Sequence, residues 1–206
     1  MTMIAALSSI SFVSSSLDIL QITLLILATD DIVTTTISSV TAVSRTARRP
    51  AFGAVFLLNN VSHLRHHLLL EPSDDIILSL LSPATSEALN SAYRTAKAGY
   101  FDLNFSPLMQ AITDDPRDKS NKAAAKEKFT RFFDLLDELV ERHRLAKVLE
   151  DDPRARGELG EEVVMLVIPS FQRFTQKQKD KEFSKSECRT IWIFVNFVAH
   201  VHCFLC

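Results

Sequence analysis

Glycine is scarce in this chain of 206 residues, which contains only Gly53, Gly99, Gly157 and Gly160. Loops that bind phosphate need clustered glycines, so that backbone N–H groups can approach the ligand. The tight turns of β-sheets also depend on glycine or on Asn-Gly pairs. The scarcity therefore predicts an all-α fold and argues against an enzyme that uses nucleotides.

Cysteine is equally restricted, because Cys188, Cys203 and Cys206 all lie in the last nineteen residues. The rest of the chain has no disulfide framework, which is typical of a cytosolic protein. The N-terminus lacks the basic segment of a secretory signal. The apolar run at residues 19–28 is shorter than the ~20 residues that span a bilayer, so we expect it to form a buried helix.

The overall balance is that of a soluble globular protein, with 47% apolar and 23% charged residues. The formal net charge of −2 excludes a nucleic-acid binder by composition. Any basic surface must therefore be local.

Helices are expected along most of the first half of the chain. We predict helix across residues 1–48, although the β-branched stretch at residues 34–40 has poor helix propensity. Pro50 suits the first turn of a helix over residues 51–70 that Pro72 ends. A short helix is predicted at residues 76–81.

The second half shows clearer helix signals. Ser82-Pro83 should cap and open a helix that reaches about Leu108, with a break near Gly99 or Pro107. Residues 119–148 should form a rod roughly 45 Å long. Its apolar stripe repeats at three- and four-residue steps and contains Phe129, Phe132, Leu136, Leu139 and His143. Asp151-Asp152-Pro153 should start the next helix, which Pro169 should kink.

Three segments resemble one known family, the seventy-kilodalton subunit of the exocyst, particularly its fungal members. They are RRPAFGAVFLLNN at residues 48–60, KEKFTRF at residues 126–132 followed by Asp137-Glu138-Leu139, and VVMLVIPSFQRF at residues 163–174. The similarity is good from about Thr41 to Ser186 and faint before it. It divides the chain into weakly matching apolar helices at residues 1–48, a family-like C-terminal region at residues 49–186, and an unmatched apolar tail at residues 187–206.

The resemblance implies an elongated stack of antiparallel helices that tethers secretory vesicles to the plasma membrane without catalysis or cofactors. It implies as partners the other exocyst subunits, a Rho-type small GTPase and phosphatidylinositol bisphosphate. The implied location is the cytoplasm and, peripherally, the plasma membrane at sites of secretion.

The chain departs from the family after Ser186, where relatives continue with a basic, lipid-contacting segment. The tripeptide Ser186-Glu187-Cys188 is compatible with GTGAGT, a common intron start, so we hypothesise that the tail is translated intron. The alternative function is accordingly a truncated or mis-spliced helical product without retained activity.

Two sets of basic residues are candidates for lipid binding, since each basic residue near an anionic leaflet contributes ~1 kcal/mol. The first set is Lys119, Lys122, Lys126, Lys128 and Arg131, and the second is Lys177, Lys179, Lys181 and Lys185. Ordinary solvated helix faces are the alternative interpretation of both sets.

Histidines form two further groups. His63, His66 and His67 lack the glutamate of a zinc-binding helix, and we interpret them as a polar, partly exposed face. His200, His202, Cys203 and Cys206 have the spacing of a metal site and end in a prenylation-like box. Both patterns are accidents if the tail is read-through, and we predict no metal site. Asn59 and Asn60 are expected to tie adjacent helices together, because buried amides need hydrogen-bond partners.

Overall fold

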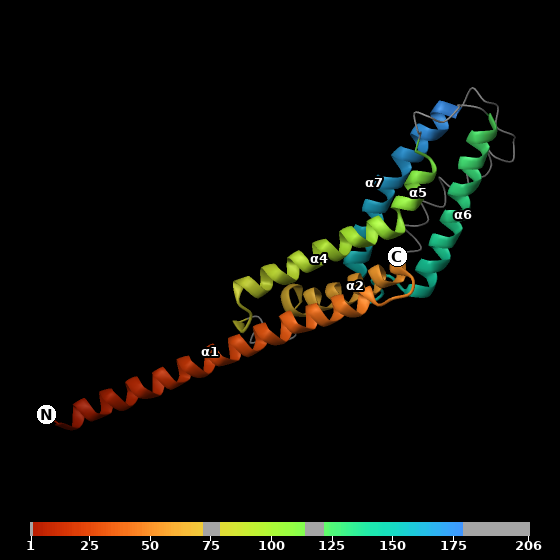
Figure 1. Cartoon of the computed structure of the whole chain (residues 1–206). Coiled ribbons are helices and arrows are strands. Elements are labelled where there is room, and N and C mark those ends of the chain that lie inside the picture. The colour runs from red at the N-terminus through yellow and green to blue at the C-terminus, as the bar shows by residue number, and fades with distance from the viewer. Residues whose placement is uncertain (1, 72–78, 114–121, 179–206) are drawn as a thin grey trace.

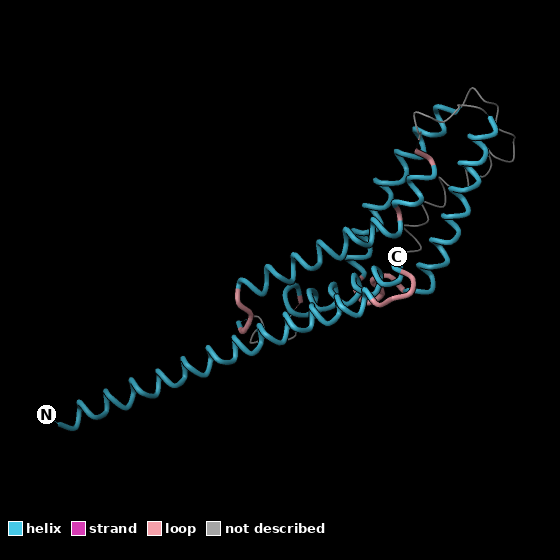
Figure 2. Tube along the Cα trace, viewed as in Figure 1, coloured by secondary structure: helices cyan, strands magenta, loops and turns pink. Residues whose placement is uncertain are grey.

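The computed structural model describes residues 2–71, 79–113 and 122–178, and the regular structure in these ranges is entirely helical (Figure 1, Figure 2). The predicted all-α fold is therefore confirmed. The elements in chain order are α1 (Thr2–Arg45), α2 (Pro50–Arg65), the π-helical turn η1 (His66–Leu70), α4 (Pro83–Asn104), α5 (Ser106–Ala111), α6 (Lys122–Ala146) and α7 (Pro153–Gln178).

The helix starts follow from local signals in the sequence. Pro50, Pro83 and Pro153 each occupy the first position of a helix, where the missing N–H costs nothing. The Ser82 hydroxyl accepts a hydrogen bond from the Thr85 N–H at 3.2 Å, and Asp152 Oδ1 accepts one from the Ala155 N–H at 2.9 Å. These are the N-caps expected of Ser and Asp, so the predicted starts of α2, α4 and α7 are confirmed.

The helix predicted from Pro83 to about Leu108 breaks at the second of its two predicted positions. Gly99 lies inside α4, whereas the chain breaks at Phe105, just before Pro107 in the first turn of α5. The helix predicted over residues 51–70 reaches Leu70, with its last five residues as the π-helical turn. Three predicted features lie largely or wholly outside the described residues. They are the helix at residues 76–81, Pro72, and the start of the rod at residues 119–121. The rod itself ends at Ala146, two residues before Val148, and α7 continues past Pro169.

The elements form an elongated molecule with one continuous apolar core. Helices α1, α2 and α4 contact one another, while α5 and α6 lie beyond the end of α4. The predicted stripe of α6 is confirmed, because Phe129, Phe132, Leu136 and Leu139 are all buried. The same core contains buried side chains of α4 and α7, spaced for one face of each helix, namely Leu89, Tyr93, Ala96, Tyr100, Leu159, Val163, Val167, Phe171 and Phe174.

Helix α1 remains helical through its β-branched stretch because the hydroxyls bond back to the helix. Thr34, Thr36 and Ser39 each donate to the carbonyl four residues earlier, at 2.7–2.8 Å. This arrangement satisfies polar side chains that otherwise compete with the helix for backbone partners. The predicted helix over this segment is confirmed.

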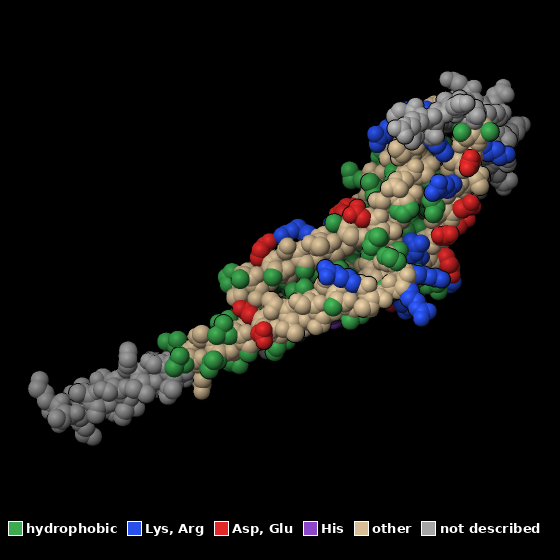
Figure 3. Space-filling model, viewed as in Figure 1, with side chains coloured by type: hydrophobic (Ala, Val, Ile, Leu, Met, Phe, Trp, Pro, Cys, Tyr) green, Lys and Arg blue, Asp and Glu red, His purple; other side chains and the backbone are tan. Residues whose placement is uncertain are grey.

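The apolar run at residues 19–28, in the middle of α1, lies outside the bundle. Its large side chains are 53–66% exposed in Ile19, Leu20, Ile22, Leu24, Leu25 and Leu27, and Figure 3 shows them along the projecting helix. The expectation that this run is buried is therefore wrong. The next contact of α1 toward its C-terminal end joins it to the start of α4, where Asp30 Oδ1 accepts the Ser82 N–H at 3.2 Å. By length and composition alone, residues 19–45 also suffice to cross a membrane, because an 18-residue window within them has a mean hydropathy of 1.4.

Gly53 permits the close approach of α1 and α2. A Cβ atom at this position would collide with the backbone carbonyl oxygen of Ser44 and press on the Ala47 methyl group. A backbone atom cannot move aside as the end of a flexible side chain does, so the two helices would have to separate. By contrast, a Cβ at Gly99 on α4 would meet nothing within 4 Å.

These two glycines give opposite predictions for the same substitution. Gly53→Ala should destabilise the fold by about 1–3 kcal/mol through overpacking. Gly99→Ala should stabilise it by about 0.4–1 kcal/mol, since alanine restricts the unfolded chain and favours helix. Urea unfolding followed by circular dichroism measures both. Equal effects of the two substitutions would contradict the close approach.

Candidate functional site

The pairing of α6 with α7 determines where the candidate lipid-binding residues lie. Phe132 of α6 packs against Phe171 of α7 with ring centroids 4.9 Å apart, and Phe129 lies 6.3 Å from the same ring. Because the two helices run antiparallel, the residues that precede Phe129 and those that follow Phe171 lie at the same end of the molecule.

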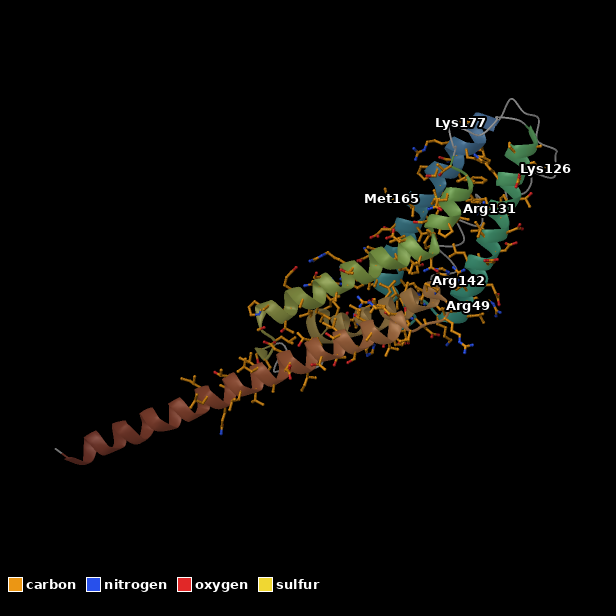
Figure 4. All side chains as sticks on the ribbon, in the orientation of Figure 1. Arg49, Lys126, Arg131, Arg142, Met165 and Lys177 are labelled. Carbon is orange, nitrogen blue, oxygen red and sulfur yellow. The ribbon has the colours of Figure 1, made fainter. Side chains whose placement is uncertain are left out.

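One described member of each predicted basic set therefore lies at this end. Figure 4 shows Lys126 of α6 and Lys177 of α7 at the same end, with Arg131 further along α6. All three side chains are exposed. Within the described residues, neither Lys126 nor Arg131 pairs with a carboxylate. We call Lys126, Arg131 and Lys177 the cationic end.

The other members of the two sets differ in what the structure describes. Lys128 Nζ donates to the backbone carbonyl of Thr113 at 3.0 Å and so fastens α6 to the end of α5. Lys122 begins α6. Lys119, Lys179, Lys181 and Lys185 lie outside the described residues, so their part in a lipid site stays a prediction.

The histidine group lies beside a small polar pocket of about 160 Å³ between α2 and the α6–α7 connection. The rings of His63 and His67 are in edge-to-face contact at 4.3 Å, and both residues are exposed. His66 is half-buried, with Nδ1 3.9 Å from Asp152 Oδ2. Among the described residues, no group of three or more His, Cys, Asp or Glu side chains is arranged to hold a metal ion. The prediction of a partly exposed polar face is confirmed.

The two neighbouring asparagines differ. Asn59 links two elements, and Asn60 bonds within its own helix. Asn59 Nδ2 donates to the Lys147 carbonyl at 3.1 Å, and Asn59 Oδ1 accepts the Leu149 N–H at 2.9 Å. Asn59 thus joins α2 to the α6–α7 connection, as predicted. Asn60 bonds only to the Phe56 carbonyl of its own helix, at 2.7 Å, so the prediction for Asn60 is wrong.

A second hydrogen bond links the same elements, and no pattern in the sequence predicts it. The Ser62 hydroxyl donates to Asp152 Oδ2 at 3.1 Å, and both residues are buried. Asp152 therefore bonds α2 with one oxygen and caps α7 with the other. The cap is readable from the Asp-Pro dipeptide, but nothing local in the sequence marks a partner ninety positions earlier.

His143 has a structural role on the apolar stripe of α6. Its Nδ1 lies 2.7 Å from the Leu139 carbonyl oxygen, which can only accept. This contact assigns the proton to Nδ1 and leaves Nε2 to accept the Tyr100 hydroxyl at 2.6 Å. Burial, aided by the charge of Arg142, lowers the pKa of His143 despite the opposing carbonyl bond. Burial likewise raises the pKa of Tyr100.

Two sequence predictions about the tail lie outside the described residues. They are the metal-like and prenylation-like patterns at His200, His202, Cys203 and Cys206 and the proposed read-through after Ser186.

Comparison with known proteins gives two matches. The family model for the C-terminal part of Exo70, an exocyst complex component, matches residues 11–192. It starts within the segment for which the sequence indicated only faint similarity, and it ends six residues past Ser186. A curated relative, the "Exocyst complex protein EXO70" of Candida glabrata, is 30% identical over 115 residues, which cover 54% of this chain. The match spans only 18% of that relative's length. No solved structure matches.

The environment of His143 predicts how stability depends on pH. With a pKa lower in the folded than in the unfolded chain, His143 stays neutral while the unfolded chain takes up a proton. Its contribution is complete above the unfolded value, about 6.5, and is lost as pH falls from there toward the folded value, at up to about 1.4 kcal/mol per pH unit. Urea unfolding between pH 8 and pH 5 should show this loss in the wild type and much less in His143→Gln.

Asn60→Ala, which removes no titrating group, is the control and should keep the wild-type dependence on pH. An unchanged dependence in His143→Gln would contradict the assignment.

Proposed function

This chain belongs to the Exo70 family of exocyst proteins, and on that premise we propose that it tethers secretory vesicles to the plasma membrane as a non-catalytic binding unit. It acts through protein contacts and through acidic lipid at the cationic end. Its location is the cytoplasm and, peripherally, the plasma membrane at sites of secretion.

The placement of Lys126 and Lys177 at one end of the molecule is the observation that supports lipid binding. Cations on separate helices act together on a flat anionic surface when they lie on the same end or face of the molecule. The aromatic contacts of Phe129 and Phe132 with Phe171 hold Lys126 and Lys177 in that relation. Each exposed cation near an anionic leaflet contributes ~1 kcal/mol, and salt screens the attraction over about 10 Å. The expected ligand is phosphatidylinositol bisphosphate.

The protein partners follow from family membership alone. We expect the other exocyst subunits and a Rho-type small GTPase to bind along the exposed helix faces. The basic terminal segment of the family has no counterpart after Ser186 in this chain. Lipid binding should therefore be weaker than in a relative that carries the segment, and it should depend more on the cationic end.

Charge reversal at the cationic end tests the lipid part of this function. The triple variant Lys126→Glu, Arg131→Glu and Lys177→Glu should bind vesicles containing phosphatidylinositol bisphosphate roughly tenfold more weakly or worse, because three attractions become repulsions. Co-sedimentation at fixed salt measures the bound fraction.

The matched control reverses the same number of charges elsewhere. Arg45→Glu, Arg48→Glu and Arg49→Glu change three exposed arginines at the α1–α2 turn and should leave vesicle binding near that of the wild type. If both variants lose binding equally, net charge alone governs the attraction and the cationic end is not a site.

A further inference from the structure

The turn between α1 and α2 carries exposed arginines that lack acidic partners. Arg45, Arg48 and Arg49 are exposed, and none lies within ion-pair distance of a carboxylate in the described part of the chain. Three other exposed arginines do have such partners: Arg94, Arg144 and Arg154 pair with Glu87, Glu141 and Glu158. The turn therefore holds cationic charge that the fold does not neutralise.

A fourth arginine reaches the same place from α6. Arg142 donates to Asn104 Oδ1 at 3.1 Å, and Asn104 Nδ2 lies 3.5 Å from the Ala51 carbonyl in the first turn of α2. Figure 4 shows Arg142 and Arg49 close together at this elbow of the molecule, and Figure 3 shows Lys and Arg side chains gathered there. We call Arg45, Arg48, Arg49 and Arg142 the arginine elbow.

An apolar groove of about 450 Å³ adjoins the arginine elbow. The end of α1, the first turns of α2 and Ala146 of α6 line it. Val43 and Phe56, which line the groove, are 55% and 40% exposed. Phe52 also lines it, and the Arg49 guanidinium lies 5.9 Å from the centre of its ring. Gly53 also lines the groove, at the point where α1 and α2 pack too closely to admit a Cβ atom.

We propose that the arginine elbow and this groove bind an acidic amphipathic helix of a partner protein. Apolar side chains at one-turn intervals on such a helix fill a groove of this kind, while its carboxylates form two-pronged hydrogen bonds with the guanidinium groups. A groove volume of about 450 Å³ is in the range of built binding pockets and accommodates a few anchoring side chains.

Charge complementarity combined with the apolar floor favours a peptide over a membrane. A lipid headgroup is anionic but offers nothing to cover Val43, Phe52 and Phe56, and a flat bilayer does not enter a groove between two helices. An acidic helix satisfies both features at once. This inference goes beyond the lipid binding proposed for the cationic end and does not depend on it.

A designed peptide tests the proposal on the complete chain. The probe is a fluorescent helix of roughly 18 residues with leucine at positions i, i+3, i+4 and i+7 and glutamate on its flanks. Its counterpart carries lysine in place of every glutamate. We expect the glutamate peptide to bind the wild type, with affinity falling as salt is raised, and the lysine peptide to bind at least tenfold more weakly. Fluorescence anisotropy measures both.

Two variants distinguish the contribution of the arginine charges to binding from that of the apolar groove. Arg45→Glu, Arg48→Glu and Arg49→Glu together should weaken binding of the glutamate peptide at least tenfold, and Val43→Asp at least fivefold. Both alter exposed side chains, and circular dichroism confirms that each variant remains folded. The cationic-end variant should bind the peptide as the wild type does, which keeps this test separate from that of lipid binding.

Several results would overturn the proposal. They are failure of the wild type to bind the glutamate peptide, equal binding of both peptides, or peptide binding unchanged by the arginine reversals. Loss of acidic-vesicle binding in the arginine variant, without loss of peptide binding, would identify the elbow as a membrane surface and would also overturn it.

Discussion

The arrangement of this molecule depends on the hydrogen bonds by which α2 fixes the connection between α6 and α7. Within that connection, Lys147 and Leu149 have φ angles of 49° and 50°, a left-handed conformation that costs non-glycine residues roughly 1–2 kcal/mol each. Asn59 bonds the backbone of both residues, and Ser62 bonds the Asp152 cap one turn later. Two side chains of one helix thereby fix the sharp reversal from which α6 and α7 extend together.

The position of this connection separates the cationic end from the arginine elbow. From the reversal, α6 and α7 extend along their shared aromatic contacts to the cationic end, where Lys126 and Lys177 lie (Figure 4). The arginine elbow lies near the opposite end of α6, beside the α1–α2 turn, which Gly53 allows to pack closely. The lipid and the partner helix that we propose as ligands would therefore bind at different places on the molecule.

The helix starts and the buried face of α6 were predictable from local sequence features. Contacts between residues far apart in the chain were not. Prolines and caps mark the helix starts at Pro50, Pro83 and Pro153, and the period of the apolar residues marks the buried face of α6. The bond between Ser62 and Asp152 joins residues ninety positions apart, so no local pattern reveals it. The placement of Lys126 and Lys177 at one end likewise depends on the pairing of α6 with α7. The apolar run of α1 misled the prediction because hydrophobicity indicates what a helix favours and not whether any other element reaches it.

We propose that this helical scaffold works as a member of the exocyst, and affinity capture tests that claim. The complete chain, tagged and expressed in its own cells, should recover other exocyst subunits in proportion to one another, and it should elute as a soluble species of assembled size. Recovery of the chain alone, or only as an aggregate, would contradict the claim and favour a helical product without retained activity.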